Sequence, residues 1–357
     1  MSFSTISPSP ITALRSAEIK GLWNPAGLTR FYRQRQNAGK TTAGVGMGGC
    51  GVRVVGHSFY KGYNQTHAWR DTFIRQLHRI LKGSRFQQNV IGGLGYVSGR
   101  SGSTTWPGGG ASLSGEAMWT FDSGWTVTSA ASINNLRCTA SGAAQARIFL
   151  DPDTYPEEAT SDIAIVHGNE AVLGSATWDL KYAASDTGFF TAGTGDITGT
   201  INMNAATQGG VFTFPAGLAG LTATLTQPFI FQISRGSGTI YFEGAYFFNG
   251  DLTSGMHAMD CSRIGAATGD ATFTNADRLA ATFTKGCTYA GNAQTFTGCY
   301  IISLDINDCN QQIALSSFKT RLAALADQVD SDSSNNASVL FVISPCLDEA
   351  LHSQTIP

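Results

Sequence analysis

Hydrophobic residues follow two different spacings along the chain, and the spacing changes near residue 100 and again near residue 250. Before the first change, the apolar run "VRVV" (52–55) predicts a buried strand. Phe73, Leu77 and Ile80 then recur at helical spacing, and Gly83 suits the end of that helix. A strand, a turn and a helix in this order are typical of an α/β unit.

The middle of the chain has a different composition and a different pattern of apolar residues. A Gly- and Ser-rich stretch, "SGRSGSTTWPGGGASLSG", is typical of a linker. Short runs rich in aromatic and β-branched residues follow it, among them "DIAIVHG" and "PFIFQISRGSGTIYFEGAYFFNGD". These runs are separated by Gly, Asn and Asp, and no long helix fits between them. The pattern predicts a β-sandwich or β-meander.

Alternating elements return after about residue 251. "CYIISLDIND" and "ASVLFVISP" predict two buried strands, with a helix over about 310–330 between them. Asp308 is the predicted N-cap of that helix, with Gln311 three residues on. Strand, helix and strand in succession predict a parallel sheet covered on both faces. The simplest architecture is one α/β domain (1–104 and 251–357) split by a β-rich insertion (105–250).

Composition narrows the classes of function. The chain has 357 residues, of which 13% are charged, and a net charge of −2, so it has no overall attraction for nucleic acid. No run of 18 apolar residues predicts a membrane span. The seven cysteines lack a Cys-x-x-Cys pair and the six histidines lack a His-Glu-x-x-His spacing, so no metal site is predicted. We expect reduced, mostly buried thiols.

Ser58 is the first candidate for chemistry. It follows Gly56 at the carboxyl end of a predicted parallel strand, the edge where sites assemble in open α/β sheets. The Gly-x-Ser-x-Gly turn of the common α/β-hydrolases needs a glycine where Tyr60 stands, so that class is excluded. From these residues alone, Ser58 is either a nucleophile or a turn residue that satisfies backbone groups.

Three blocks in order resemble the SGNH (GDSL-type) hydrolases. "GHSFYKG" resembles the opening Gly-Asp-Ser-x-x-x-Gly block, with His57 in place of aspartate. "GMHAMDCSRIGAATGD" resembles the block that supplies an oxyanion-hole glycine, best matched by Gly265. "YIISLDINDC" resembles the strand that ends in Gly-x-Asn-Asp, with Asp305 in place of the glycine and with Asn307 and Asp308 retained. The resemblance covers roughly residues 25–100 and 251–345 and is closest to SGNH-type minor tail proteins of bacteriophages, which carry a β-sandwich inside the hydrolase fold.

The resemblance implies both a fold and a reaction. The fold is an SGNH or flavodoxin-like three-layer parallel sheet, interrupted by a sandwich-like insertion. The reaction is acyl transfer, with Ser58 as nucleophile and with the Gly265 backbone N–H and the Asn307 amide among the oxyanion donors. No cofactor is implied. The implied protein is a homo-oligomeric esterase or deacetylase of a virion tail, made in the host cytoplasm, whose partners are other tail proteins and cell-surface glycan.

Departures from the family pattern motivate a rival hypothesis. If Asp305 faced the pocket, its carboxylate would oppose a nearby oxyanion. The family's base lies in a late Asp-x-x-His block, whereas Asp348 and His352 are spaced Asp-x-x-x-His and are expected in a loop or short turn. We therefore expect that the base lies beyond residue 357 or has been lost. In the second case the chain is an inactive structural or receptor-binding, cell-wall-binding tail protein.

A third hypothesis places function in the insertion. Trp119, Trp125 and Trp178 are candidates to stack on sugar rings, which would make the insertion a glycan-binding module. The alternative is that each tryptophan belongs to the core of the sandwich. The sequence leaves this choice open.

Overall fold

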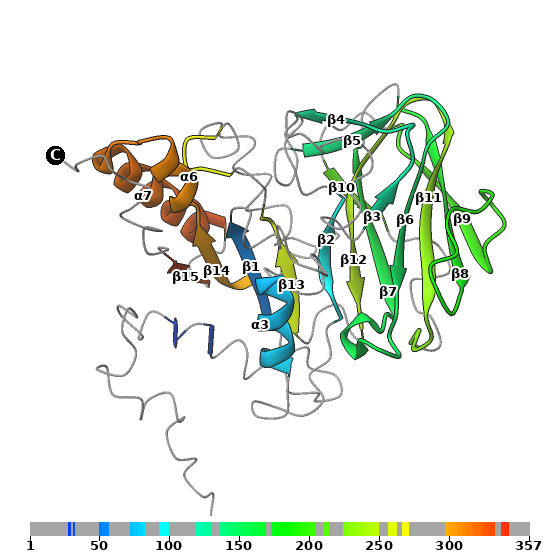
Figure 1. Cartoon of the computed structure of the whole chain (residues 1–357), viewed down its shortest axis with the longest axis horizontal. Coiled ribbons are helices and arrows are strands. Elements are labelled where there is room, and N and C mark those ends of the chain that lie inside the picture. Colours follow the sequence, from blue (N-terminus) through cyan, green and yellow to red (C-terminus); the bar gives the residue numbers. More distant parts are fainter. Residues whose placement is uncertain are drawn as a thin grey trace, which may run out of the picture.

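The fold is described from a computed structural model of the whole chain (Figure 1). The structure describes residues 28–29, 31–32, 50–56, 72–82, 93–99, 119–129, 136–168, 173–204, 210–213, 224–249, 256–262, 266–270, 297–332 and 337–342.

Parallel strands form one half of the larger sheet. They are β1 (Cys50–Gly56), β2 (Gly95–Ser98), β13 (Met256–Asp260), β14 (Thr297–Ser303) and β15 (Ser338–Phe341). Their order across the sheet is β2-β13-β1-β14-β15, which places β1 at the centre of the parallel part. The strands predicted from "VRVV", "CYIIS" and "ASVLF" are confirmed.

The middle of the chain forms a sandwich, as its short runs of aromatic and β-branched residues predict. One layer is a sheet with the order β3-β6-β11-β8-β9 among the described strands. Its strands are β3 (Trp119–Phe121), β6 (Gln145–Leu150), β8 (Ser175–Tyr182), β9 (Ile197–Asn202) and β11 (Phe229–Ser237). The other layer contains β4 (Thr126–Ser129), β5 (Leu136–Ala140), β7 (Asp162–Gly168), β10 (Gly210–Thr213) and β12 (Ile240–Phe248).

This second layer is not separate from the parallel strands. β12 pairs antiparallel with β2, with Tyr246 opposite Tyr96, and also with β7, with Tyr246 opposite Ala164. Hydrogen bonds therefore run from β15 through β1 and β2 into the sandwich, and Figure 1 shows the two regions side by side along this sheet. The edge that β2 would otherwise expose is covered by β12.

The predicted fold class, a three-layer parallel α/β sheet interrupted by a sandwich, is wrong for the part of the chain that the structure describes. Strands predominate, and the parallel strands are part of a mixed ten-stranded sheet. The long connection from β2 to β13 is filled by antiparallel strands, where a crossover helix would otherwise lie. The described α-helices with defined ends are α3 (Phe73–Lys82), α6 (Asp305–Asn310) and α7 (Leu315–Asp332). None of these described helices is long and apolar enough to cross a bilayer.

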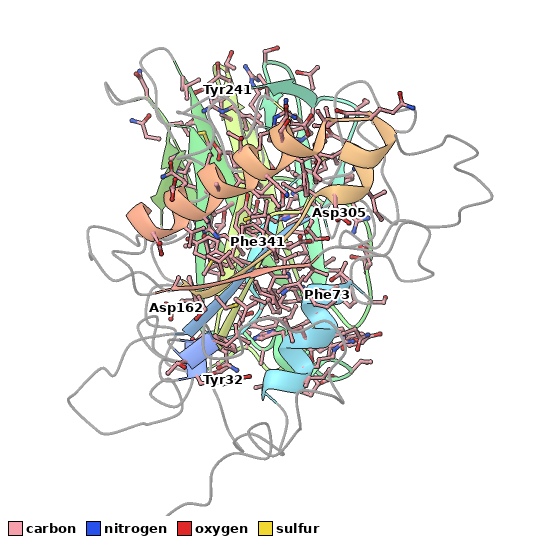
Figure 2. All side chains as sticks on the ribbon, turned by 90° about the vertical axis from the view of Figure 1, so that its left-hand side faces the viewer. Tyr32, Phe73, Asp162, Tyr241, Asp305 and Phe341 are labelled. Atoms are coloured by element: carbon pink, nitrogen blue, oxygen red, sulfur yellow. The ribbon has the colours of Figure 1, made fainter. Side chains whose placement is uncertain are left out.

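Helices α3 and α7 pack against opposite faces of the parallel strands. Ile74 of α3 belongs to a cluster with Val52 and Val54 of β1, whereas Leu325 and Val329 of α7 belong to a cluster with Val55. Side chains alternate between the faces of a strand, so β1 is covered on both sides. Figure 2 shows α7 lying across the near face of the sheet.

The face of α3 that packs inward differs from the predicted one. Phe73 and Ile80, two of the three apolar residues at helical spacing, are 41% and 59% exposed. Arg75 and His78 are buried instead, beside Ile74. The Arg75 guanidinium reaches the carbonyl oxygen of Leu94 through Nη1 at 2.7 Å, which satisfies a donor that burial would otherwise leave unpaired.

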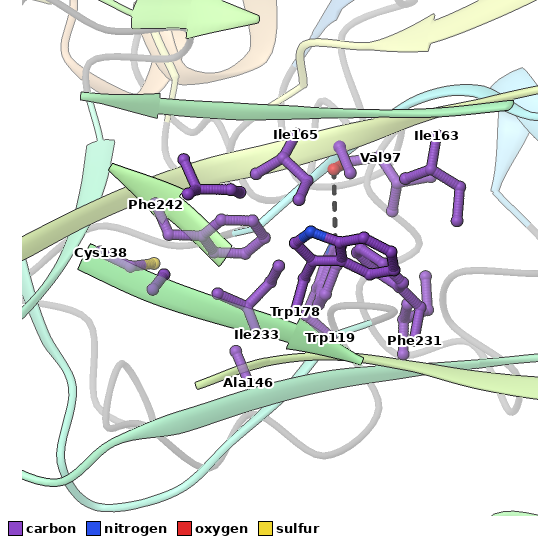
Figure 3. Packing of buried hydrophobic residues seen from close by; sticks show 14 of the residues in the cluster. Val97, Trp119, Cys138, Ala146, Ile163, Ile165, Trp178, Phe231, Ile233 and Phe242 are labelled. Carbon is purple, nitrogen blue, oxygen red and sulfur yellow. Dashed lines mark hydrogen bonds between the residues drawn. The ribbon is translucent and has the colours of Figure 1, made fainter. Parts of the chain in front are cut away.

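The tryptophans of the sandwich lie in its core. Trp119, Trp125 and Trp178 are all buried, and Trp119 meets the ring of Phe242 edge to face at 4.7 Å (Figure 3). The indole Nε1–H of Trp119 donates to the carbonyl oxygen of Val97 at 3.4 Å. These three rings are therefore not available as sugar-stacking platforms, and the core interpretation is correct.

Candidate functional site

The carboxyl ends of three parallel strands lie next to one another, and each leads into one of the three sequence blocks. Gly56, the last residue of β1, pairs with Ser303 of β14. On the other side of β1, Val54 pairs with Asp260, the last residue of β13. Ser58 comes two residues after Gly56 and, with His57, lies outside the described residues.

The block after β13 continues the pairing with β1 for one residue and then turns at Asp260–Ser262. The Cys261 backbone N–H donates to the carbonyl oxygen of Val54 at 2.9 Å, and the Ser262 N–H donates to Asp260 Oδ1 at 2.9 Å. The hydroxyl of Ser262 is fully buried and has no hydrogen-bond partner among the residues that the structure describes. Gly265 lies outside the described residues, and the chain is described again from Ala266.

Asn307, the third predicted site residue, lies on the short helix α6 and is half-buried. Its side-chain Nδ2 donates to the carbonyl oxygen of Ala266 at 2.8 Å. This contact joins the second and third blocks, although 41 residues separate the two partners. The structure thus brings Asn307 to the loop that follows Gly265, whereas the positions of Ser58 and Gly265 relative to it stay predictions.

Asp308 does not cap the long helix as predicted. α7 begins at Leu315, and Asp308 lies inside α6, because the chain turns between the two helices at Gln312, which has a φ of 55°. The Asp308 carboxylate instead accepts two hydrogen bonds from Thr268, one from the backbone N–H at 2.8 Å and one from Oγ1 at 2.5 Å. Asn307 and Asp308 therefore both hold the same loop.

The Asp305 carboxylate, at the carboxyl end of β14, is 5% exposed. The Ser303 hydroxyl donates to its Oδ1 at 3.3 Å, and Figure 2 shows the residue where the sheet meets α6. The candidate base residues Asp348 and His352 lie outside the described residues. His78 and His167, which are described, are both buried, and burial lowers the pKa of His167.

Three cysteines of the described ranges, Cys138, Cys261 and Cys299, are buried and free. Burial raises the pKa of the Cys299 thiol to about 12, so this group stays a neutral, unreactive thiol near neutral pH. The expectation of buried thiols is confirmed for these three. Across the described ranges, no group of three or more His, Cys, Asp or Glu side chains is arranged to hold a metal ion.

Comparison with known proteins supports the resemblance at the level of the fold. No family model matches the sequence, and no curated protein matches it. Among solved structures, the chain is similar to a peptidoglycan O-acetylesterase, with a TM-score of 0.51 and 14% sequence identity. The match covers 88% of this chain and 70% of the other. The chain is thus similar in fold to this esterase, even though its sheet is mixed.

Two further matches are weaker. One is a family two carbohydrate esterase from Clostridium thermocellum in complex with cellohexaose, with a TM-score of 0.24 and 11% identity over 60% of this chain and 75% of that chain. The other is a xylan-binding domain of carbohydrate-binding module family 22, with a TM-score of 0.24 and 14% identity over 44% of this chain and 97% of that chain.

Proposed function

We propose that the chain is a serine esterase that removes acyl groups, such as acetyl, from glycan esters of a cell envelope. The hydrogen bond from Asn307 to Ala266 carries this proposal, because it joins two of the three blocks at the edge where β1 leads to Ser58. The similarity in fold to a peptidoglycan O-acetylesterase supports the class of substrate.

The proposed reaction has two steps. The Ser58 Oγ attacks the ester carbonyl carbon while a base takes its proton, and the sugar hydroxyl leaves with a proton as the acyl-enzyme forms. Water then attacks the acyl-enzyme, releases the carboxylic acid and restores the serine. In each step the carbonyl oxygen carries negative charge. The proposed donors to it are the backbone N–H groups of Ser58 and Gly265 and the Asn307 amide, and loss of one donor typically costs about 3–4 kcal/mol of barrier.

The biological setting is part of the proposal and rests on the sequence resemblance alone. In it, the chain is a minor component of a phage tail, assembled from copies of itself and from other tail proteins, and it meets glycan at the host surface. Electron microscopy of virions labelled with an antibody to the chain tests this setting, because label that is absent from the tail contradicts it.

Acetate release tests the activity. The full chain, incubated with O-acetylated peptidoglycan, is expected to release acetate, and Ser58→Ala is expected to lower kcat/KM by about 10³-fold or more. The matched control is Ser317→Ala, which removes an exposed serine hydroxyl on α7 and should leave the rate unchanged. A fluorophosphonate probe should add to Ser58 in the wild-type chain. Absence of both acetate and adduct contradicts the esterase proposal.

The alternative is a catalytically inactive tail protein that binds the envelope and retains the fold. The buried Asp305 carboxylate favours this alternative, because it lies two residues before Asn307, where an oxyanion would have to be stabilised. It predicts that the chain binds purified cell wall and that Ser58→Ala leaves the affinity unchanged. Ester turnover that disappears with Ser58→Ala contradicts it.

A further inference from the structure

The loop Ala266–Asp270 is held against helix α6 by side chains of two neighbouring residues. Asn307 Nδ2 donates to the Ala266 carbonyl oxygen at 2.8 Å, and the Asp308 carboxylate accepts from the Thr268 N–H and hydroxyl. The loop also closes on itself, since the Ala267 N–H donates to Asp270 Oδ2 at 3.0 Å and the Asp270 N–H donates to the Ala267 carbonyl at 3.1 Å. The loop is thus a compact turn with two attachments to α6.

The attachment at Ala266 fixes the direction of the Asn307 amide. A side-chain amide is planar and has two N–H donors. With one N–H bound to Ala266, the plane is set and the second N–H points in a defined direction. That direction depends on where the Ala266 carbonyl lies, and Asn307 itself provides only one of the two attachments that hold this loop in place.

The second attachment is charged and shielded from solvent. Asp308 is 3% exposed, and burying a carboxylate is costly unless hydrogen-bond donors meet it, as the two donors of Thr268 do. Arg321 of α7 lies with its Nη1 3.8 Å from Asp308 Oδ1, which places a positive charge beside this carboxylate. Gly269 makes room for this guanidinium, because a methyl group there would lie 2.6 Å from Arg321 Nη1.

We infer that Asp308 is a positioning residue of the proposed esterase, an inference that rests on the proposed function. Through Thr268 it holds the Ala266 carbonyl, and through that carbonyl it orients the Asn307 amide toward the oxyanion. Asp308 does not touch the substrate in this scheme. Its removal affects the stabilisation of the oxyanion, which develops in the transition state, and leaves ground-state binding of the substrate unchanged.

Two substitutions test the inference in the full chain. Asp308→Asn keeps the size of the side chain and removes its charge, and Thr268→Val keeps the size of Thr268 and removes only its hydroxyl donor. Because a displacement of about 1 Å can cost about 100-fold, Asp308→Asn is expected to lower kcat by about 10- to 100-fold, with KM within about threefold of wild type. Thr268→Val should lower kcat in the same way but less. Thr268→Ser, which restores the hydroxyl, should return kcat to near the wild-type value.

Controls distinguish a loss of positioning in these variants from a general loss of stability. Thr320→Val makes the same chemical change as Thr268→Val at an exposed position on α7, where the hydroxyl donates to the carbonyl oxygen of Ser316 at 3.0 Å. It should leave kcat and KM unchanged. The rates are compared at a temperature at which circular dichroism shows each variant to be folded. If Asp308→Asn does not fold, Thr268→Val and Thr268→Ser decide the question.

The outcomes distinguish this inference from the function on which it rests. Lower kcat at constant KM in Asp308→Asn and Thr268→Val, with recovery in Thr268→Ser, supports it. An active wild type whose folded variants keep the wild-type kcat, or change only KM, overturns the positioning role and leaves the esterase proposal standing. A wild type with neither acetate release nor a fluorophosphonate adduct overturns both.

Discussion

The space between the two sandwich layers and the carboxyl edge of the parallel strands bury different kinds of side chain, although the sandwich strands and loops also bury Glu158, Asp179 and Glu243 elsewhere. Between the sandwich layers the buried groups are mainly aromatic and aliphatic, as in the contacts of Trp119 with Phe231 and Phe242. At the carboxyl edge three carboxylates are buried, those of Asp260, Asp305 and Asp308. Packing is non-directional, whereas a buried carboxylate needs donors at defined positions. The packing between the sandwich layers therefore contributes mostly to stability, whereas the buried carboxylates at the edge mostly fix the positions of the groups that donate to them.

The strongest test of this comparison removes a ring from the sandwich. Trp119→Ala is expected to lower the free energy of unfolding by about 3–5 kcal/mol, because the cavity lies among rings that cannot all close over it. Urea denaturation followed by circular dichroism measures the loss. Tyr182→Ala, which truncates an aromatic ring that is 44% exposed, should change stability by less than about 1 kcal/mol. Equal losses for the two variants would contradict the assignment of Trp119 to the core.

A second test acts where the two regions meet. Gly95 begins β2 with a φ of +74°, and a methyl group there would lie 2.0 Å from the carbonyl oxygen of Ala258 in β13. Gly95→Ala is expected to lower the free energy of unfolding by about 3 kcal/mol, because the backbone conformation is strained for alanine and the strands must separate. Gly142→Ala is the matched control, since no atom lies within 4 Å of its added methyl group. A stable Gly95→Ala variant would mean that β2 and β13 do not approach so closely.

The smallest expected effect concerns a polar residue in the sandwich. Burial lowers the pKa of His167 below its ordinary value of 6.5. Below pH 6.5 the unfolded chain therefore binds a proton that the folded chain does not, so stability present above that pH is lost as the pH falls toward the lower, folded-state pKa. Urea midpoints at pH 7.5 and pH 5.5 should differ less in His167→Gln than in the wild-type chain. Equal differences in the two proteins would contradict a lowered pKa.

Strand positions could be predicted from the sequence, but the buried face of α3 could not. Valine-rich runs such as "VRVV" indicate strands covered on both faces, and β1 is such a strand, with Arg53 buried as well. In α3 the apolar spacing pointed to Phe73 and Ile80, yet Arg75 and His78 face inward. The partner of Arg75 is the Leu94 carbonyl oxygen, 19 residues away, and helical periodicity carries no information on such a contact.

The candidate site was predictable only in part, because its contacts also join residues that are far apart in the sequence. The order of the three blocks predicts that Asn307 meets the loop after Gly265, and the bond to Ala266 agrees with that. The role of Asp308 was not predictable, since an Asp followed by Gln three residues later is typical of a helix N-cap. Its true partner, Thr268, lies 40 residues earlier. The mixed connection of the sheet, with β12 beside β2, also had no signal in the sequence.

That connection fixes the position of the sandwich relative to the strand ends. A hinge between two bodies needs a few residues whose backbone dihedral angles can change. Hydrogen bonds instead run without a break from β14 through β1, β13, β2 and β12 to β7. The sandwich therefore keeps one orientation relative to the strand ends, and motion between the two regions would require the pairing of β2 with β12 or β13 to break.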